Sequence, residues 1–191
     1  MSFQYTGSSG KPKFQCNLTC YQCTAHVKKG GRCKKKTCGS LPLCWIHLKE
    51  RGLKIAKSSI PNSGKGVFAT KNFDKGALVG NYFGQELTRD QLNKRYGATN
   101  ADFAPYGLAY SNNTFLDAAC KRSYSSMINH KPSSQANVSF SVDRLNRRIN
   151  VKTSKPIKKG DELFVNYGRD YFKNSNAPQP KFHTSTYKLK K

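Results

Sequence analysis

The chain has 191 residues, enough for one medium-sized domain and a small appended module. Its 34 Lys and Arg residues outnumber 10 Asp and Glu residues, and the net charge of +24 favours association with polyanions such as DNA. No stretch is long and apolar enough to span a membrane, and no apolar run follows the first five residues. The composition therefore predicts an intracellular protein with no membrane partner.

Composition divides the chain into four segments. Residues 1–15 are polar and predict a disordered lead-in, and residues 16–50 hold six of the seven cysteines. Residues 51–172 carry the alternating apolar pattern of a main domain, and residues 173–191 are polar and basic, which predicts a flexible tail. We expect basic residues at both ends to bind DNA.

The Cys-rich segment has the spacing of a small metal module. Zinc takes four nitrogen or sulfur ligands in a tetrahedron, and a segment of this length is too short to build a core without a staple. In a reducing compartment, clustered cysteines also favour a metal over disulfides. We predict that Cys23, Cys33, Cys44 and His47 bind a structural zinc ion. A competing set replaces Cys33 with Cys20.

The same segment carries a basic run, Lys34-Lys35-Lys36, next to Cys33. Such a run is a candidate nuclear import signal or nucleic-acid contact, although a solvated charge run is the simpler explanation. A nuclear location is the favoured interpretation.

The sequence of the main domain predicts many short strands. Apolar and polar residues alternate, and turns rich in Gly, Asn or Asp separate the runs. Without a strand–helix–strand rhythm, the pattern predicts a mostly β fold with small helices. The expected strands are 53–56, 64–69, 77–84, 138–142, 149–151 and 163–165, with two more within 106–117 on either side of a turn at Asn112-Asn113. Short helices are expected at 88–97 and 123–128.

Four motifs follow one another in this domain. Residues 64–69 read Gly-Lys-Gly-Val-Phe-Ala, residues 115–118 read Phe-Leu-Asp-Ala, and residues 128–130 read Ile-Asn-His. Residues 160–168 read Gly-Asp-Glu-Leu-Phe-Val-Asn-Tyr-Gly. In this order and spacing they resemble SET domains, the protein-lysine methyltransferase fold, and in particular the compact SET proteins of large DNA viruses. The resemblance implies a β-clip-like set of small sheets with a pseudoknot, an exception to the rule against threading.

The resemblance also implies S-adenosylmethionine as cofactor and an exposed lysine of a protein, with a histone tail favoured, as substrate. Tyr167 and Tyr82 would line the lysine channel as catalytic residues. A Tyr hydroxyl orients an amine while its ring excludes water. The cofactor contacts implied by the family are Lys65, Gly66, Val67, Asn129, His130, Tyr167, Tyr171 and Phe172.

Several positions depart from the family pattern. Ser126-Met127 replaces an Arg-aromatic pair, and Asn166 replaces an Asp before the last Tyr. Val165 stands where the family limits the methyl count with Tyr or Phe, so we expect di- or trimethylation. The alternative hypothesis is a basic, zinc-containing DNA-binding or packaging protein whose SET domain is not catalytic. The compact viral relatives also suggest a homodimer.

Overall fold

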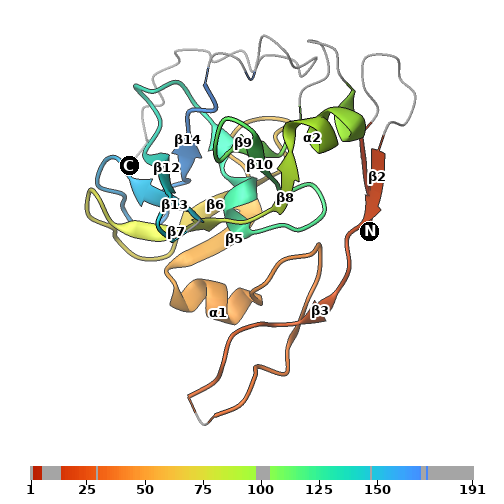
Figure 1. Ribbon diagram of the computed structural model, residues 1–191. Helices are drawn as coiled ribbons and strands as arrows, with labels where there is room; N and C mark the ends of the chain where they lie inside the picture. Colours follow the sequence, from red (N-terminus) through yellow and green to blue (C-terminus); the bar gives the residue numbers. More distant parts are fainter. Residues whose placement is uncertain are drawn as a thin grey trace.

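The computed structural model describes residues 2–5, 14–28, 30–97, 104–146, 148–168 and 171. Within these residues the chain forms short strands, two α-helices and one 3-10 helix (η1), so the predicted mostly β fold is confirmed (Figure 1). In chain order the elements are β1 (Ser2–Tyr5), β2 (Phe14–Asn17), β3 (Tyr21–Gln22), β4 (Lys36–Thr37), α1 (Trp45–Glu50), β5 (Leu53–Lys57), β6 (Lys65–Ala69), β7 (Leu78–Tyr82), β8 (Gln85–Thr88), α2 (Arg89–Tyr96), β9 (Gly107–Ala109), β10 (Thr114–Asp117), η1 (Tyr124–Met127), β11 (Asn129–His130), β12 (Val138–Asp143), β13 (Arg148–Thr153) and β14 (Phe164–Val165).

The largest sheet has the strand order β11-β14-β12-β13-β7. Strand β14 pairs in parallel with β11 on one side and with β12 on the other, and residues 131–137, which connect these two neighbours, pass across it. The side chain of Asn137 fastens the crossing. Its Nδ2 donates to the carbonyl of Glu162 at 2.9 Å, and its Oδ1 accepts from the N–H of Phe164 at 2.7 Å. This is the threaded, pseudoknot arrangement.

Two smaller sheets flank the largest one. Strands β8, β10 and β9 form one sheet, in which β9 is an edge, and β5 pairs with β6. The core lies between the β5–β6 pair and the large sheet, where Leu53, Val67, Val151 and Leu163 are almost completely buried.

Helix α2 begins and ends where the sequence predicts. The Thr88 hydroxyl accepts from the N–H of Gln91 at 3.2 Å, and the Gln91 side chain accepts from the N–H of Thr88 at 2.9 Å, which is a capping box. Gly97 follows the last helical residue with φ of 100°, a backbone conformation that favours glycine.

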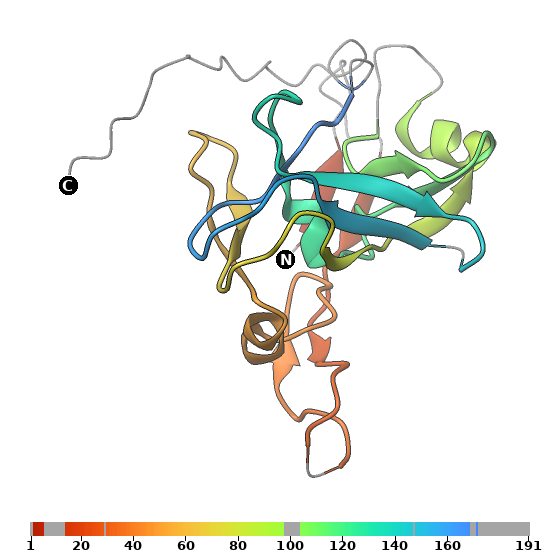
Figure 2. The same cartoon turned by 90° about the vertical axis from the view of Figure 1, so that its left-hand side faces the viewer.

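The Cys-rich segment projects from one end of the molecule, as the two perpendicular views in Figures 1 and 2 show. We call residues 18–50 the head. Its β3–β4 pair and helix α1 are short, but Leu43 and Leu48 join the same buried cluster as Leu53 of β5. The head is therefore continuous with the core of the main domain at its base.

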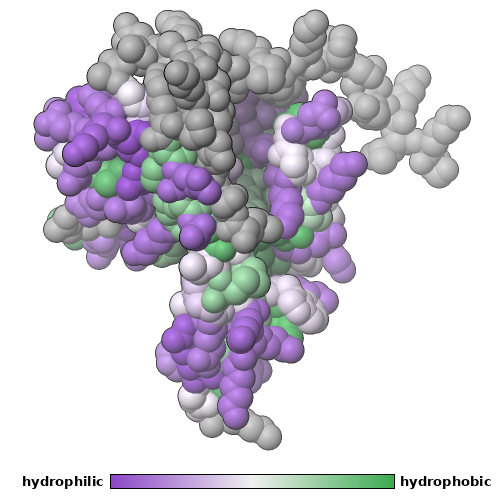
Figure 3. Space-filling view, turned by 90° about the vertical axis from the view of Figure 1, so that its right-hand side faces the viewer, coloured by the Kyte–Doolittle hydropathy of each residue, from purple (hydrophilic) through white to green (hydrophobic). Residues whose placement is uncertain are grey.

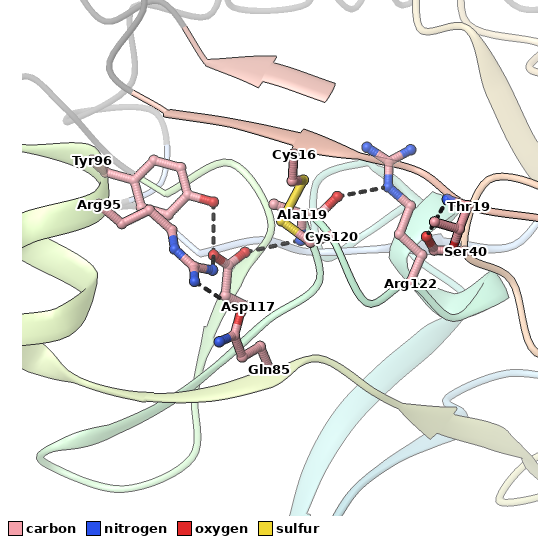
Figure 4. The surroundings of a disulfide bond; sticks show 10 residues. All are labelled: Cys16, Thr19, Ser40, Gln85, Arg95, Tyr96, Asp117, Ala119, Cys120 and Arg122. Atoms are coloured by element: carbon pink, nitrogen blue, oxygen red, sulfur yellow. Dashed lines mark hydrogen bonds and ion pairs between the residues drawn. A yellow bond between two sulfur atoms is a disulfide. The ribbon is translucent and has the colours of Figure 1, made fainter. Parts of the chain in front are cut away.

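The N-terminal segment departs from its prediction. Residues 2–5 and 14–17 pair as antiparallel strands, so part of the lead-in expected to lack structure is ordered. A disulfide between Cys16 and Cys120 holds β2 in place (Figure 4). The Phe14 ring also packs against Tyr96, with 5.6 Å between ring centroids.

The basic tail, residues 173–191, lies outside the described residues, so its predicted flexibility stays a prediction. Among the helices described, neither has the length and apolar character needed to cross a membrane.

Candidate active site

A cavity of about 630 Å³ opens where the threaded segments meet the sheet that contains β9. Its walls come from the turn before β6, from strand β9, from residues 125–129, and from residues 166–168 with Tyr171. The cavity falls in the size range of sites for small molecules and cofactors. Residues far apart in the sequence therefore build one site around the pseudoknot.

Tyr167 is fixed at both its backbone and its hydroxyl. The hydroxyl donates to the carbonyl of Ile128 at 2.7 Å, and the backbone N–H donates to Nδ1 of His130 at 3.0 Å. The rings of Tyr167 and Tyr171 meet edge to face at 4.7 Å between centroids. The side chain therefore has one orientation at the cavity wall.

Tyr82 contributes the opposite aromatic wall. It is 6% exposed, its hydroxyl donates to the carbonyl of Tyr106 at 2.7 Å, and its ring packs against Phe140 at 5.4 Å. The guanidinium of Arg122 lies 4.8 Å from the Tyr106 ring centroid, which is cation–π geometry. Arg122, Tyr106 and Phe140 also line the cavity.

Burial keeps the cavity tyrosines protonated. Desolvation is the largest cause that raises the pKa of Tyr82 well above its ordinary value, with Tyr167 and Asp117 adding to it. Desolvation also raises the pKa of Tyr167, and it raises that of Tyr171 to about 12. Near neutral pH the hydroxyls are therefore neutral donors. Burial lowers the pKa of His130, so its ring is neutral and Nδ1 accepts the Tyr167 N–H.

A polar cluster forms the wall next to β6. Asn129 Nδ2 donates to the carbonyl of Lys65 at 3.0 Å. Behind it lies the carboxylate of Glu162, 6% exposed, which accepts from Ser58 Oγ at 2.7 Å and from the N–H of Ser59 at 2.7 Å. Asn129 Nδ2 also lies 3.4 Å from this carboxylate. Glu162 therefore links the turn at Ser58 and Ser59 to the segment that carries Asn129.

Gly66 is required by this packing. A Cβ at this position would overlap the Glu162 carboxylate, so any other residue forces the wall to move. The Glu162 carboxylate can pack directly against the backbone of β6 only because this side chain is absent.

The structure brings most of the predicted site residues together. Lys65, Asn129, Tyr82 and Tyr167 line the cavity. Three others do not line it: Gly66 and Val67 are buried in β6, and His130 lies against Tyr167. Phe172 lies outside the described residues.

Sequence reasoning missed Tyr106, Arg122, Phe140 and Glu162. Glu162 sits inside the 160–168 motif and so carried a signal. The others lie in segments without a motif, and only the fold brings them to the cavity.

A second site lies in the head. One ligand atom from each of Cys23, Cys33, Cys44 and His47 lies within 4.8 Å of all the others. His47 Nδ1 is 3.3 Å from Cys44 Sγ and 3.6 Å from Cys23 Sγ. In a tetrahedral zinc site the ligand atoms are separated by roughly 3.5–3.8 Å, given Zn–S and Zn–N bonds near 2.3 and 2.0 Å. The four residues therefore fit zinc.

The surroundings of these ligands also suit a metal. The N–H of Cys44 donates to Cys23 Sγ at 3.3 Å, and Glu50 Oε2 lies 3.8 Å from Nε2 of His47, where a carboxylate can orient the imidazole. Burial raises the pKa of the Cys44 thiol, but hydrogen bonds from His47, Ile46 and Cys23 outweigh this and lower it to about 6.

The expectation that the clustered cysteines favour a metal over disulfides is wrong for Cys16, Cys20 and Cys38. Cys20 bonds to Cys38 across the ends of the β3–β4 pair, and Cys16 bonds to Cys120. The competing metal set fails because the sulfur of Cys20 is already in a disulfide. Disulfides are typical of oxidising surroundings, so clustering alone does not support the reducing compartment that we expected.

Comparisons with known proteins agree with this geometry. The family model described as SET domain matches residues 64–168. Over 126 residues the chain is 29% identical to Histone-lysine N-methyltransferase EZH2 of Chaetomium thermophilum, with 61% of this chain and 8% of that protein covered. Over 175 residues it is 25% identical to the Variant-silencing SET domain-containing protein of Plasmodium falciparum, with 84% and 7% covered.

Among solved structures, a chain of the Chaetomium thermophilum polycomb repressive complex 2 matches with a TM-score of 0.54 and 28% identity, over 61% of this chain and 15% of that one. A form of that complex bound to S-adenosylmethionine matches with a TM-score of 0.52 and the same identity and coverage. This chain therefore spans less than a fifth of the length of these relatives.

Proposed function

Because the chain belongs to the SET domain family, we propose that it is a protein-lysine N-methyltransferase that uses S-adenosylmethionine. The observation that carries the proposal is a pair of tyrosines on one cavity, the buried Tyr82 and the half-buried Tyr167, each with its hydroxyl held by a backbone carbonyl. Two such side chains form a narrow aromatic passage that fits an aliphatic lysine stem.

The residues on the β6 side fit the cofactor. Lys65 and Asn129 present polar groups to a cavity of suitable volume, and Gly66 lets the Glu162 carboxylate pack against β6 next to Asn129. When bound, S-adenosylmethionine supplies a methyl group activated by a sulfonium. The neutral His130 would act through the position of Tyr167 rather than as a base.

The tyrosines would prepare the lysine. A free lysine has a pKa near 10.4, and an aromatic passage with little water disfavours its charged form. Because Tyr82 and Tyr167 keep their protons, neither serves as the general base, and the lysine proton leaves to solvent before the side chain enters. The hydroxyl groups then orient the neutral amine, and alignment of the reactants supplies most of the rate enhancement.

The substrate would bind as an added strand. Strand β9 is the edge of its sheet and its three residues line the cavity, so an extended peptide can pair with it and point a lysine inward. We propose a histone tail as substrate, and hence a nuclear location. Two matched relatives are named histone-lysine methyltransferases, and one matched structure is a complex with H3K27me3 and H3K27M.

We further propose that Cys23, Cys33, Cys44 and His47 hold a structural zinc ion, which would stabilise a head too small to fold on its own core. The division into a lead-in at 1–15, a zinc module at 16–50, a SET domain at 51–172 and a tail at 173–191 stands as part of this proposal. Likeness to viral SET proteins and a homodimer remain predictions of the sequence.

The test is transfer of labelled methyl from S-adenosylmethionine to nucleosomes and to free histones, with Tyr167→Phe as the control. Label on a histone that is lost in the variant supports the enzyme, and mass spectrometry then identifies the lysine. Cofactor binding without label on any histone points to another protein substrate.

The competing function is a DNA-binding protein with a non-catalytic SET domain. It is favoured by the exposed Asn166, whose Nδ2 donates to Ser133 Oγ at 2.5 Å, at a position where the family has an acidic residue. If S-adenosylmethionine does not bind in equilibrium dialysis, the catalytic proposal is rejected in its favour.

A further inference from the structure

We propose that the head is a docking surface for duplex DNA, centred on Lys34, Lys35 and Lys36. This goes beyond methyl transfer and holds whether or not the chain is an enzyme. Between residues 16 and 50 the sequence has seven Lys or Arg residues and a single acidic residue, Glu50. Figure 3 shows the head as a largely hydrophilic projection, away from the bulk of the molecule.

The lysines of this surface are available for a partner. Lys28, Lys34, Lys35 and Lys36 are all exposed, and within the described residues none of their side chains forms an ion pair. Arg32 is different, because its guanidinium donates to the carbonyl of Cys23 at 2.8 Å and so braces the head. Among the residues that the structure describes, no acidic group therefore neutralises the positive charge of these four lysines.

The lysine run is held at both ends. Cys33, immediately before it, is one of the four clustered metal-type ligands, and Cys38, two residues after it, is bonded to Cys20. Lys36 also pairs with Gln22 in the β3–β4 ladder. A run fixed at a candidate metal centre, a disulfide and a strand pair loses little backbone entropy on binding, unlike a flexible charge run. The structure thus favours a preorganised binding surface over a flexible, solvated run of charges.

Trp45 extends this surface. It is the only tryptophan of the chain, it is 71% exposed, and it follows Cys44, whose sulfur lies within 4.8 Å of that of Cys33. The cluster therefore brings the backbone at Trp45 near the start of the lysine run. An indole N–H is a donor that suits phosphate oxygens, and its ring can pack on sugars.

Charge chemistry favours duplex DNA as the partner. Lysines bind phosphates as point charges without reading sequence, and a duplex has twice the axial charge density of a single strand. The head is too basic to attract a basic histone tail, so DNA bound near the substrate is the partner that its charge fits. DNA held at the head would keep a chromatin protein within reach of the cavity.

The test measures the affinity of the full chain for a labelled 20-base-pair duplex at several salt concentrations. We compare the wild type with Lys34→Ala/Lys35→Ala/Lys36→Ala. A matched control, Lys152→Ala/Lys158→Ala/Lys159→Ala, removes the same charge from exposed positions outside the head. Each lost phosphate contact lowers the slope of log affinity against log salt by about 0.9.

We expect the head variant to lose at least tenfold in affinity at moderate salt and up to about 2.7 in salt slope, whereas the control loses much less. Trp45→Ala should weaken binding a few-fold without changing the slope, because an aromatic ring releases no counterion. Unchanged zinc content and unchanged methyl transfer to free histones would show that the head variant is folded and that its defect is confined to DNA.

Equal losses in the head variant and the control would overturn the proposal, because binding would then follow total charge alone. Displacement of DNA by polyglutamate at equal charge concentration would instead point to an acidic protein. Tighter binding to single-stranded DNA or to duplex RNA would also reject duplex DNA as the partner.

Discussion

The hydroxyl of Tyr167 donates to the carbonyl of Ile128, joining two segments 39 residues apart at the wall of the cavity. We predict that Tyr167→Phe lowers methyl transfer by roughly a hundredfold, because the amine loses a positioned hydroxyl. The free energy of unfolding should fall by only about 1 kcal/mol, the usual value of one hydrogen bond. Steady-state kinetics and urea unfolding measure the two effects. Tyr110→Phe, which does not line the cavity, is the control and should leave the rate unchanged.

Glu162 tests the polar wall. Glu162→Gln removes the charge that accepts from Ser58 and Ser59, and we predict a loss of about 2 kcal/mol in unfolding free energy. Because Asn129 lies 3.4 Å from the same carboxylate, the KM for S-adenosylmethionine should rise about tenfold while kcat changes little.

A double-mutant cycle with Ser58→Ala separates this interaction from general damage. If the two substitutions are additive in unfolding free energy, the Ser58–Glu162 hydrogen bond is not what stabilises the wall.

The metal site is tested by zinc content. Cys33→Ser should bring the zinc bound per chain well below one, because three ligands remain where zinc needs four. Cys20→Ser is the matched control: it removes a cysteine of the same segment whose sulfur is bonded to Cys38. Elemental analysis of both variants decides between the two. Zinc lost in Cys20→Ser but retained in Cys33→Ser would restore the competing ligand set.

Val165 tests the methyl count. It is 2% exposed, pairs with His130 on one side and Val138 on the other, and is smaller than the aromatic residues that the family places there. We predict di- or trimethyl-lysine as the final product of the wild type, and a shift towards monomethyl-lysine in Val165→Tyr. Mass spectrometry of substrate incubated with the enzyme until methylation stops measures the number of methyl groups on the lysine. A wild type that stops at monomethyl-lysine would reject the prediction.

The buried tyrosines predict loss of stability at high pH. Burial raises the pKa of Tyr82 in the folded state, so its contribution is complete below pH 10 and is lost as the pH rises above 10, where the unfolded chain releases the proton. Above pH 10, each tyrosine that stays protonated in the folded protein should lower the free energy of unfolding by about 1.4 kcal/mol per pH unit.

Urea unfolding of the wild type and of Tyr82→Phe between pH 9 and 11 measures the slope. The variant should depend less steeply on pH by one proton, and the lysine titrations cancel in the difference. Equal slopes would mean that Tyr82 ionises normally in the folded protein.

The sequence predicted the metal-type cluster for a local reason, whereas the cavity residues were expected from the resemblance of four motifs to SET domains. Cys44 and His47 are three residues apart, and turns with Gly30, Gly31 and Gly39 surround Cys33, so nearby spacing carried the information. The choice between Cys33 and Cys20 was different. It depended on the pairing of Cys20 with Cys38 across two strands, which spacing does not reveal.

Other features were not predicted from the sequence because they depend on tertiary contacts. Helix α1 has six residues, no side-chain cap and no acidic residue in its first turn, so it carries no start signal. Tyr106 reaches the cavity only through the pairing of β9 with β10, and β1 forms against a strand that Cys120 holds in place. The strand pattern and the motifs were readable, whereas contacts between distant segments were not.

The position of β14 between β11 and β12 has a consequence for synthesis on the ribosome. A nascent chain that has not yet released residues 164–165 from the exit tunnel lacks the strand that both neighbours pair with, and it also lacks Tyr167. Until then β11 and β12 expose edges that have no pairing strand, and exposed edges promote aggregation or binding by chaperones. The proposed binding of S-adenosylmethionine should therefore arise abruptly, late in translation, rather than grow as the chain lengthens.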